Sequence, residues 1–243
     1  MRNKVVLITG AGKGIGRSLA VDLLSKGAFI ICLTRSKQDL KDLKNNKNCK
    51  IFYGDVSNTK TINNIFKFSE KEGKIINSLV NNAGMRQRKK FQDLRDKEIY
   101  EVFETNFFSI FRLMQIFLKF SLKHKIKSSI VNIGSIVGEN GFAELSGYGA
   151  TKAALKNLTK SFAVEFANKG IRANIVNPGF TKTSYFKNFK NNKKLYNWTL
   201  SRIPQKRWAE PHEIVPIIEF LISNESSYMT GESINIDGGW LSS

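Results

Sequence analysis

The sequence is poor in residues that build disulfide frameworks and metal sites. Its 243 residues include two cysteines, Cys32 and Cys49, and two histidines, His124 and His212. Two cysteines give no disulfide framework, and Cys32 lies in an apolar run, which predicts a small core residue. Neither histidine belongs to a spacing that is typical of metal ligands, so we expect no catalytic metal.

Long apolar runs are also missing. No apolar stretch approaches the ~20 residues that cross a bilayer, so we expect no membrane partner. The first residues lead directly into the apolar run Val5–Thr9, so we expect no signal peptide and a cytoplasmic location.

Acidic residues are few, with 20 Asp and Glu against 39 Lys and Arg, and the formal net charge is +19. The lysines are scattered among asparagines, and no helix-turn-helix, zinc or RNA-binding pattern accompanies them. We therefore expect no nucleic-acid partner. So basic a surface still attracts anions, which favours an acidic substrate or carrier.

Short apolar runs alternate with helical patterns along the whole chain, which predicts an α/β fold with a parallel sheet and helices on both faces. The predicted strands are Val5–Thr9, Phe29–Thr34, Lys50–Tyr53, Ser78–Asn81, Ser129–Ile133, Arg172–Val176 and Ser233–Ile236. The length suits one domain over residues 1–243, and no repeat or linker interrupts it.

A glycine-rich segment near the N-terminus reads Thr9-Gly-Ala-Gly-Lys-Gly-Ile-Gly16. Apolar residues follow it at helical spacing from Ile15 to Leu24, so it predicts a strand-to-helix turn. Glycines there allow positive φ and close approach of a phosphate. The helix N-terminus also offers free N–H groups to a pyrophosphate. The alternative interpretation is a purely structural turn.

Tyr148 and Lys152 lie four residues apart, and Ser135 lies thirteen residues upstream of Tyr148. Residues i and i+4 share one face of a helix, so the ammonium of Lys152 would favour the phenolate of Tyr148. Lowering a phenol pKa from about 10 to about 7 takes roughly 4 kcal/mol. Tyr148 could then exchange a proton with an alcohol or alkoxide, while the Ser135 hydroxyl donates to the same oxygen. The alternative is that the pair merely begins an ordinary helix.

Together these motifs resemble the short-chain dehydrogenase/reductase family from Lys4 to the C-terminus. The matching segments are Thr9–Gly16, Asp55–Val56, Asn81–Gly84, Asn106, Ser135, Tyr148, Lys152, Pro178–Gly179 and Thr181. The resemblance implies a single Rossmann-type, doubly wound sheet of seven parallel strands. It also implies a mobile substrate lid around 180–207, although that region could be a solvated loop with one or two short helices. The activity implied is hydride transfer between a nicotinamide cofactor and a carbonyl or secondary alcohol.

The resemblance assigns a role to each matching residue. Asp55 and Val56 would border the adenine, Asn82 to Gly84 the adenosine ribose, and Thr181 the carboxamide of the nicotinamide. The residues predicted to bind the cofactor are Gly10, Gly12, Lys13, Gly14, Ile15, Gly16, Thr34, Arg35, Ser36, Asp55, Val56, Asn82, Ala83, Gly84, Tyr148, Lys152, Pro178, Gly179 and Thr181. The predicted catalytic residues are Ser135, Tyr148, Lys152 and Asn106.

The end of the second strand predicts the cofactor. An acidic residue there favours NAD, whereas a basic one accommodates the 2′-phosphate of NADP. Here Thr34 is followed by Arg35, no acidic residue occupies the position, and Lys13 is a second candidate for the phosphate. We therefore predict NADP(H). The alternative is that Arg35 is only a surface charge.

The segment from about Lys97 to Lys123 is expected to be one long helix that is apolar on nearly every side. Such a helix is buried on more than one face, so a partner subunit is expected, and the family resemblance implies a homotetramer. Asn106 within it would hold a water in a proton relay through Lys152, or be a satisfied amide of the core; both interpretations stay open.

Several segments of the sequence bear on the identity of the substrate. The segments Asn81–Phe91, Arg207–Trp208 and Asp237–Leu241 resemble gluconate and deoxygluconate dehydrogenases. The layout, with Lys125, Lys127 and Lys169, resembles 3-oxoacyl-acyl-carrier-protein reductases. We favour a polar, anionic, sugar-derived ketone or alcohol that Arg86 and Arg88 would hold, with the acyl-carrier substrate as the alternative. Those two arginines could instead only solvate a surface turn. A non-catalytic, cofactor-binding scaffold is a further alternative, against which the intact Ser135, Tyr148 and Lys152 argue.

Overall fold

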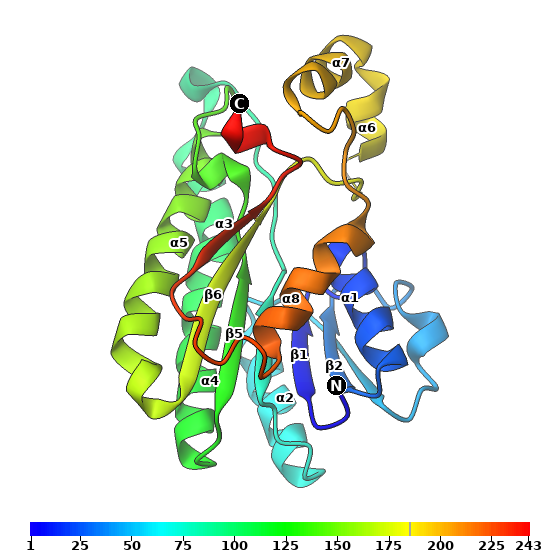
Figure 1. Cartoon of the computed structure of the whole chain (residues 1–243), viewed down its shortest axis with the longest axis vertical. Helices are drawn as coiled ribbons and strands as arrows, with labels where there is room; N and C mark the ends of the chain where they lie inside the picture. The colour runs from blue at the N-terminus through cyan, green and yellow to red at the C-terminus, as the bar shows by residue number, and fades with distance from the viewer. Residues whose placement is uncertain (185) are drawn as a thin grey trace.

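Parallel strands form the centre of the fold in the computed structural model, which describes residues 1–184 and 186–243 (Figure 1). The strands are β1 (Val5–Thr9), β2 (Phe29–Thr34), β3 (Cys49–Tyr53), β4 (Ser78–Asn81), β5 (Ser128–Ile133), β6 (Ile171–Pro178) and β7 (Ser233–Ile236). They form one seven-stranded sheet in the order β3-β2-β1-β4-β5-β6-β7, and every neighbouring pair is parallel. The predicted Rossmann-type fold is confirmed, with strand ends within two residues of those predicted.

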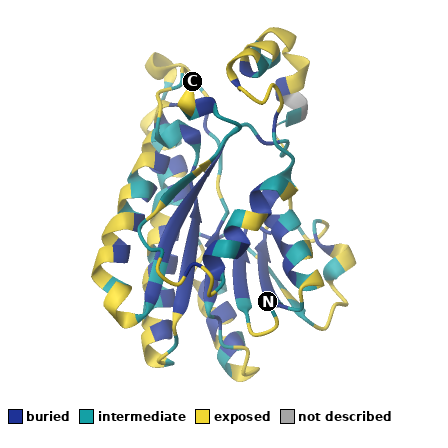
Figure 2. Cartoon of the chain, in the orientation of Figure 1, coloured by how far each residue is buried: buried dark blue, intermediate teal, exposed yellow. Residues whose placement is uncertain are grey.

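Helices cover both faces of this sheet because successive strand residues point to opposite sides. Val6 and Ile8 of β1 pack into one apolar cluster, and Leu7 between them packs into the other. The first cluster is covered by α1 (Gly14–Ser25) and α8 (Val215–Ile222), and the second by α2 (Thr59–Lys71), α4 (Ser109–Lys123) and α5 (Ser146–Phe166). The central strands are accordingly buried (Figure 2). Among the described residues, no helix combines the length and the apolar character that crossing a bilayer requires.

The predicted single helix from Lys97 to Lys123 is wrong in one respect. It consists of α3 (Asp96–Phe103), a π-helical turn at Glu104–Phe108, and α4. A π turn inserts an extra residue into a helix and frequently marks a functional site. Here it contains Asn106, which is fully buried, so the irregular turn places this side chain beside the loop that follows β4.

The region 180–207 contains two helices, α6 (Phe186–Asn191) and α7 (Lys193–Arg202), which stand beyond the carboxyl ends of the strands (Figure 1). A third apolar cluster joins this region to the C-terminal segment, with Ile136, Phe189, Ile203, Trp208 and Trp240 buried in it. The predicted short helices are thus present, while movement of this region as a lid stays a prediction. Short 3-10 turns complete the chain at Lys41–Leu43, Phe91–Asp93, Ile136–Gly138, Ala167–Lys169, Pro211–Ile214 and Trp240–Ser242.

Candidate active site

The glycine turn connects β1 to α1 at the carboxyl edge of the sheet. Gly14 has a φ of +54°, which side chains other than glycine rarely adopt. A Cβ at Gly16 would lie 2.4 Å from the carbonyl oxygen of Gly10, so only glycine fits there. Lys13, which precedes α1, makes no side-chain cap. The first N–H groups of the helix therefore have the character of an anion site.

Asn82 holds this turn against the end of β4. Its Nδ2 donates to the carbonyl oxygens of Thr9 (3.1 Å) and Gly10 (3.0 Å). In return, the Thr9 hydroxyl accepts hydrogen bonds from the backbone N–H groups of Asn82 (3.1 Å) and Ala83 (3.0 Å). The predicted cofactor residues at 82 and 83 thus fix the shape of the glycine turn itself.

A cavity of about 530 Å³ opens over this turn and the ends of β2 and β3; we call it the glycine-turn cavity. The predicted residues that line it are Gly10, Gly12, Lys13, Gly14, Ile15, Thr34, Arg35, Ser36, Asp55, Val56, Asn82, Ala83 and Gly84. Backbone N–H groups, glycines and two cations surround it, and this donor set fits the phosphates and ribose of a dinucleotide.

The structure corrects one expectation about this cavity. The sequence places no acidic residue directly at the end of β2, yet Asp39 lines the cavity. The Thr34 hydroxyl donates to its Oδ2 (3.2 Å), and Lys13 Nζ lies 3.5 Å from its Oδ1. The turn after β2 folds back, which brings a residue five positions beyond the strand to the strand's end. Arg35 likewise faces a carboxylate, Asp55, at 3.8 Å.

Ser135, Tyr148 and Lys152 meet in a second cavity of about 230 Å³, which we call the Tyr148 cavity. Ser135 follows β5, and the other two lie near the start of α5. Ser135 Oγ accepts a hydrogen bond from the N–H of Val137 (3.2 Å), and Lys152 Nζ lies 5.8 Å from the centre of the Tyr148 ring. The predicted residues Pro178, Gly179 and Thr181 also line this cavity. Because Ile15, Asn82, Gly84, Met85 and Thr183 line both cavities, the two adjoin.

Lys152 is 5% exposed, and its ammonium donates to the carbonyl oxygen of Ile133 at 2.7 Å. Burial lowers the pKa of Lys152 to about 8, because a low-dielectric environment disfavours the charged form. At neutral pH the side chain still carries its charge, one helical turn from Tyr148.

Asn106 is a fully paired amide. Its Oδ1 accepts from the N–H of Met85 (2.8 Å), and its Nδ2 donates to the carbonyl of Met85 (2.9 Å) and to Thr151 Oγ1 (3.2 Å). It therefore anchors the loop after β4, which lines both cavities. This agrees with a satisfied core amide, while a role in a proton relay stays a prediction.

Apolar side chains form much of the wall of the Tyr148 cavity, a feature that the sequence pattern did not reveal. They are Met85, Ile136, Val137, Phe142, Leu145, Phe180 and Trp208. Trp208 donates from Nε1 to Thr199 Oγ1 (2.8 Å), which fixes its ring against Phe180 at a centroid distance of 5.0 Å. Single aromatic residues far apart in sequence give no periodic pattern, so only the fold brings them together.

The structure separates the basic residues that follow β4. Arg86 lines the Tyr148 cavity and lies over the Phe189 ring, with its Cζ 5.6 Å from the ring centre. Arg88 lies at 5.7 Å from the same ring, but its Nε binds Glu144 at 2.7 Å. Among the described residues, the cavity lining includes Arg86 and not Arg88.

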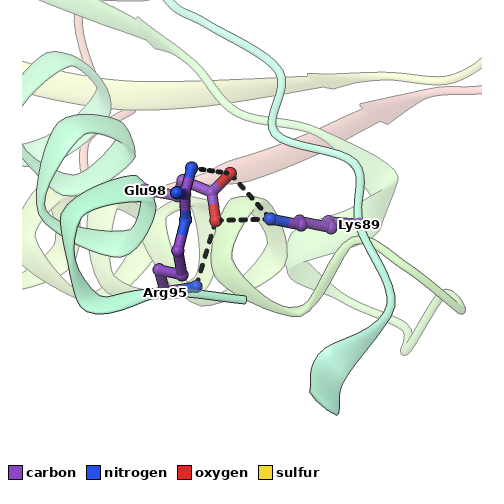
Figure 3. Close-up of polar contacts among 3 residues, drawn as sticks. All are labelled: Lys89, Arg95 and Glu98. Carbon is purple, nitrogen blue, oxygen red and sulfur yellow. Dashed lines mark hydrogen bonds and ion pairs between the residues drawn. The ribbon is translucent and has the colours of Figure 1, made fainter. Parts of the chain in front are cut away.

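Lys89 is a structural residue. Its Nζ binds both carboxylate oxygens of Glu98, at 3.0 and 2.9 Å, where Glu98 caps the start of α3 (Figure 3). The backbone N–H of Arg95, and then the side chains of Lys89 and Arg95, hold the pKa of Glu98 at about 2. The loop that carries Arg86 is therefore tied to α3.

Other polar and ionisable groups lie outside the site. Cys32 is buried on β2, Cys49 is half-buried on β3, and His124 pairs with Glu70 at 2.9 Å. In the part of the chain that the structure describes, no group of three or more His, Cys, Asp or Glu is placed to hold a metal ion.

Comparisons with known proteins agree with this architecture. A family model described as enoyl-(acyl carrier protein) reductase matches residues 10–241. The 3-oxoacyl-acyl-carrier-protein reductase FabG of Vibrio cholerae is 34% identical over 241 residues, which cover 98% of each chain.

Solved structures of other proteins are also similar to this chain. A 4-hydroxyisoleucine dehydrogenase in complex with NADH superposes with a TM-score of 0.93 at 34% identity, covering 99% of each chain. An Agrobacterium tumefaciens structure with bound NADP, assigned by inference as a 2-deoxy-D-gluconate 3-dehydrogenase, has a TM-score of 0.92 at 29% identity, covering 100% of this chain and 98% of the other. Both predicted resemblances are confirmed, and the chain belongs to the short-chain dehydrogenase/reductase family of oxidoreductases that act on CH–OH groups.

Proposed function

We propose that the protein is an NADP(H)-dependent oxidoreductase that interconverts a ketone and a secondary alcohol in the Tyr148 cavity. One observation carries this proposal. Ser135, Tyr148 and Lys152, from two separate elements, line one cavity that adjoins the glycine-turn cavity. A non-catalytic scaffold protein would not need these three side chains in one cavity. Their meeting therefore supports an enzyme over the non-catalytic alternative.

The chemistry divides between the cofactor and the chain. A bound nicotinamide dinucleotide supplies or accepts the hydride. Tyr148 gives its phenolic proton to the substrate oxygen during reduction and takes it back during oxidation. The Ser135 hydroxyl donates a hydrogen bond to the same oxygen. The Lys152 ammonium favours the phenolate, because opposite charges attract strongly in a buried site.

Two cations support NADP(H) as the preferred cofactor. Lys13 and Arg35 both line the glycine-turn cavity, and arginine binds phosphate through paired, charge-assisted hydrogen bonds. Similar proteins bind either cofactor, NADH in one structure and NADP in another, so the proposed preference rests on the side chains of this cavity and not on the family.

Two substrate classes fit different parts of the Tyr148 cavity. Arg86 at the cavity wall suits the carboxylate of a sugar acid. The apolar wall around Phe142, Phe180 and Trp208 suits a 3-oxoacyl chain better than a polyol. Lys125 and Lys127, just before β5, and Lys169, just before β6, lie at the opposite edge of the sheet from this cavity. The acyl alternative therefore rests on the apolar wall and not on those lysines.

Tyr148→Phe tests the catalytic proposal. The variant should bind NADPH as the wild type does but lose at least about 100-fold in turnover, because it has no proton to transfer. Steady-state NADPH oxidation and fluorescence titration of NADPH measure the two properties. Near-normal turnover would show that another group handles the proton.

Lys152→Met should abolish turnover yet stabilise the cofactor-free protein at pH 7. A lysine with a lowered pKa costs folding free energy wherever it stays charged, so the cost is full below pH about 8 and fades as the pH rises toward the unfolded value of 10.5. We expect a gain of about 1–3 kcal/mol in the free energy of unfolding.

Denaturant titrations at several pH values measure this gain. Lys160→Met, at an exposed position of the same helix, is the matched control and should shift stability by less than about 0.5 kcal/mol. Destabilisation by Lys152→Met at pH 7, or a difference that does not shrink at high pH, contradicts the assigned pKa.

Arg86→Ala should raise the Michaelis constant for an anionic substrate by roughly tenfold or more, the scale of a lost charged hydrogen bond, and spare neutral ketones. Arg88→Ala is the matched control, because Arg88 does not line the Tyr148 cavity, and it should leave that constant within about twofold. If both substitutions changed the Michaelis constant equally, Arg86 would not be the residue that binds the anionic group of the substrate.

We also propose that the protein is a homotetramer. Tyr100, Phe108 and Phe111, along α3, the π turn and α4, are 69%, 44% and 38% exposed, and Val164 of α5 is 85% exposed. Burying them favours association. Light scattering should give four times the chain mass of 27.5 kDa, and the double variant Phe108→Glu, Phe111→Glu should give smaller species. A monomeric wild type at micromolar concentration contradicts this proposal.

A further inference from the structure

We infer that Asp39 is a specificity-determining residue. Its carboxylate accepts a hydrogen bond from the 2′-hydroxyl of the adenosine ribose of NADH, and it repels the 2′-phosphate of NADPH. The inference rests on the proposed dinucleotide function. If it holds, Lys13 and Arg35 alone do not set the preference between NADPH and NADH, and the affinity for NADH depends on Asp39.

The carboxylate of Asp39 is held inside the cavity. Its side chain is 13% exposed, and Oδ2 accepts a hydrogen bond from the Thr34 hydroxyl at 3.2 Å. Gly12, Arg35 and Ser36 line the cavity beside it. The carboxylate therefore takes the place at the end of β2 where dinucleotide folds put the acidic residue that binds a ribose hydroxyl.

Gly12 makes the room that this carboxylate occupies. A Cβ built at Gly12 would lie 2.4 Å from Oδ2 of Asp39 and 2.5 Å from Oγ1 of Thr34. Any larger residue at position 12 would displace the carboxylate from the glycine turn. The Asp39 carboxylate thus occupies space that is available only because residue 12 is a glycine.

The loop that carries Asp39 is also anchored. Arg17 of α1 donates from Nη1 to the carbonyl oxygen of Asp39 at 2.7 Å, and from Nη2 to Oδ2 of Asp42 at 2.9 Å. Because one guanidinium binds two points of the loop, the position of the Asp39 backbone is fixed relative to the helix that begins at the glycine turn.

The charges that line the glycine-turn cavity explain why Asp39 would affect the choice between NADPH and NADH. The ionisable residues that line the glycine-turn cavity are Lys13, Arg35, Asp39 and Asp55. Each cation faces one carboxylate, at 3.5 Å for Lys13 and Asp39 and at 3.8 Å for Arg35 and Asp55. The cavity lining is therefore neutral in a chain of net charge +19. A 2′-phosphate must compete with Asp39 for Lys13, whereas a ribose hydroxyl can donate to Asp39 without breaking a pair.

Asp39→Asn tests the inference by equilibrium binding. The amide keeps an oxygen for the Thr34 hydroxyl but removes the charge. Fluorescence titration should show NADPH binding roughly tenfold tighter and NADH binding several-fold weaker than in the wild type. Asp39→Ser, which removes the charge with a different shape, should change both affinities in the same directions.

Asp93→Asn is the control for the loss of one negative charge, since Asp93 is exposed and does not line the glycine-turn cavity, and it should leave the ratio of the two affinities unchanged. A ratio in Asp39→Asn and Asp39→Ser equal to that of the wild type overturns the inference but leaves the proposed function intact. A wild type that binds neither NADPH nor NADH overturns the proposed function itself.

Discussion

The buried ammonium of Lys152 is the interaction on which the active site depends. It lies beneath the carboxyl end of β5, donates to the carbonyl of Ile133, and is separated by one helical turn from Tyr148. Burying a lysine is unfavourable, as its lowered pKa shows. The sheet and α5 supply the packing that offsets this cost. In the proposed mechanism, this loss of stability provides a fixed positive charge one helical turn from the phenol of Tyr148.

The two adjoining cavities have different physical characters. The glycine-turn cavity is polar and its lining charges cancel in pairs. The Tyr148 cavity has apolar walls, with Arg86 as a cation beside the aromatic cluster. Under the proposed function, recognition of the cofactor would depend on small differences between these opposing charges. Under the same proposal, recognition of the substrate would depend on the shape of the Tyr148 cavity, on apolar contacts and on the charge of Arg86.

The sequence predicted the sheet almost completely, because its strands are short runs rich in apolar residues, and the five central strands are buried on both faces. The sequence also predicted the glycine turn, Ser135, Tyr148 and Lys152, since each lies at a strand end or at helical spacing within one local segment. Asp39 was missed because a turn of irregular structure brings it back to the strand end. The π turn at Asn106 was missed because an extra residue in a helix leaves no clear periodic pattern. The aromatic wall combines Phe142 from the segment between β5 and α5 with Phe180 and Trp208 from the segment between β6 and α8, and no local pattern connects them.

The central claim is that the Tyr148 cavity reduces and oxidises real substrates. Its most direct test is NADPH oxidation by the wild-type protein over a panel of 3-oxoacyl thioesters, keto-sugar acids and neutral ketones, with the corresponding alcohols and NADP⁺ in the reverse direction. The expected result is turnover with at least one ketone class, and turnover of the corresponding alcohol in the reverse direction. Tight binding of the dinucleotide without turnover of any ketone or alcohol would contradict it, and would identify the chain as a cofactor-binding scaffold.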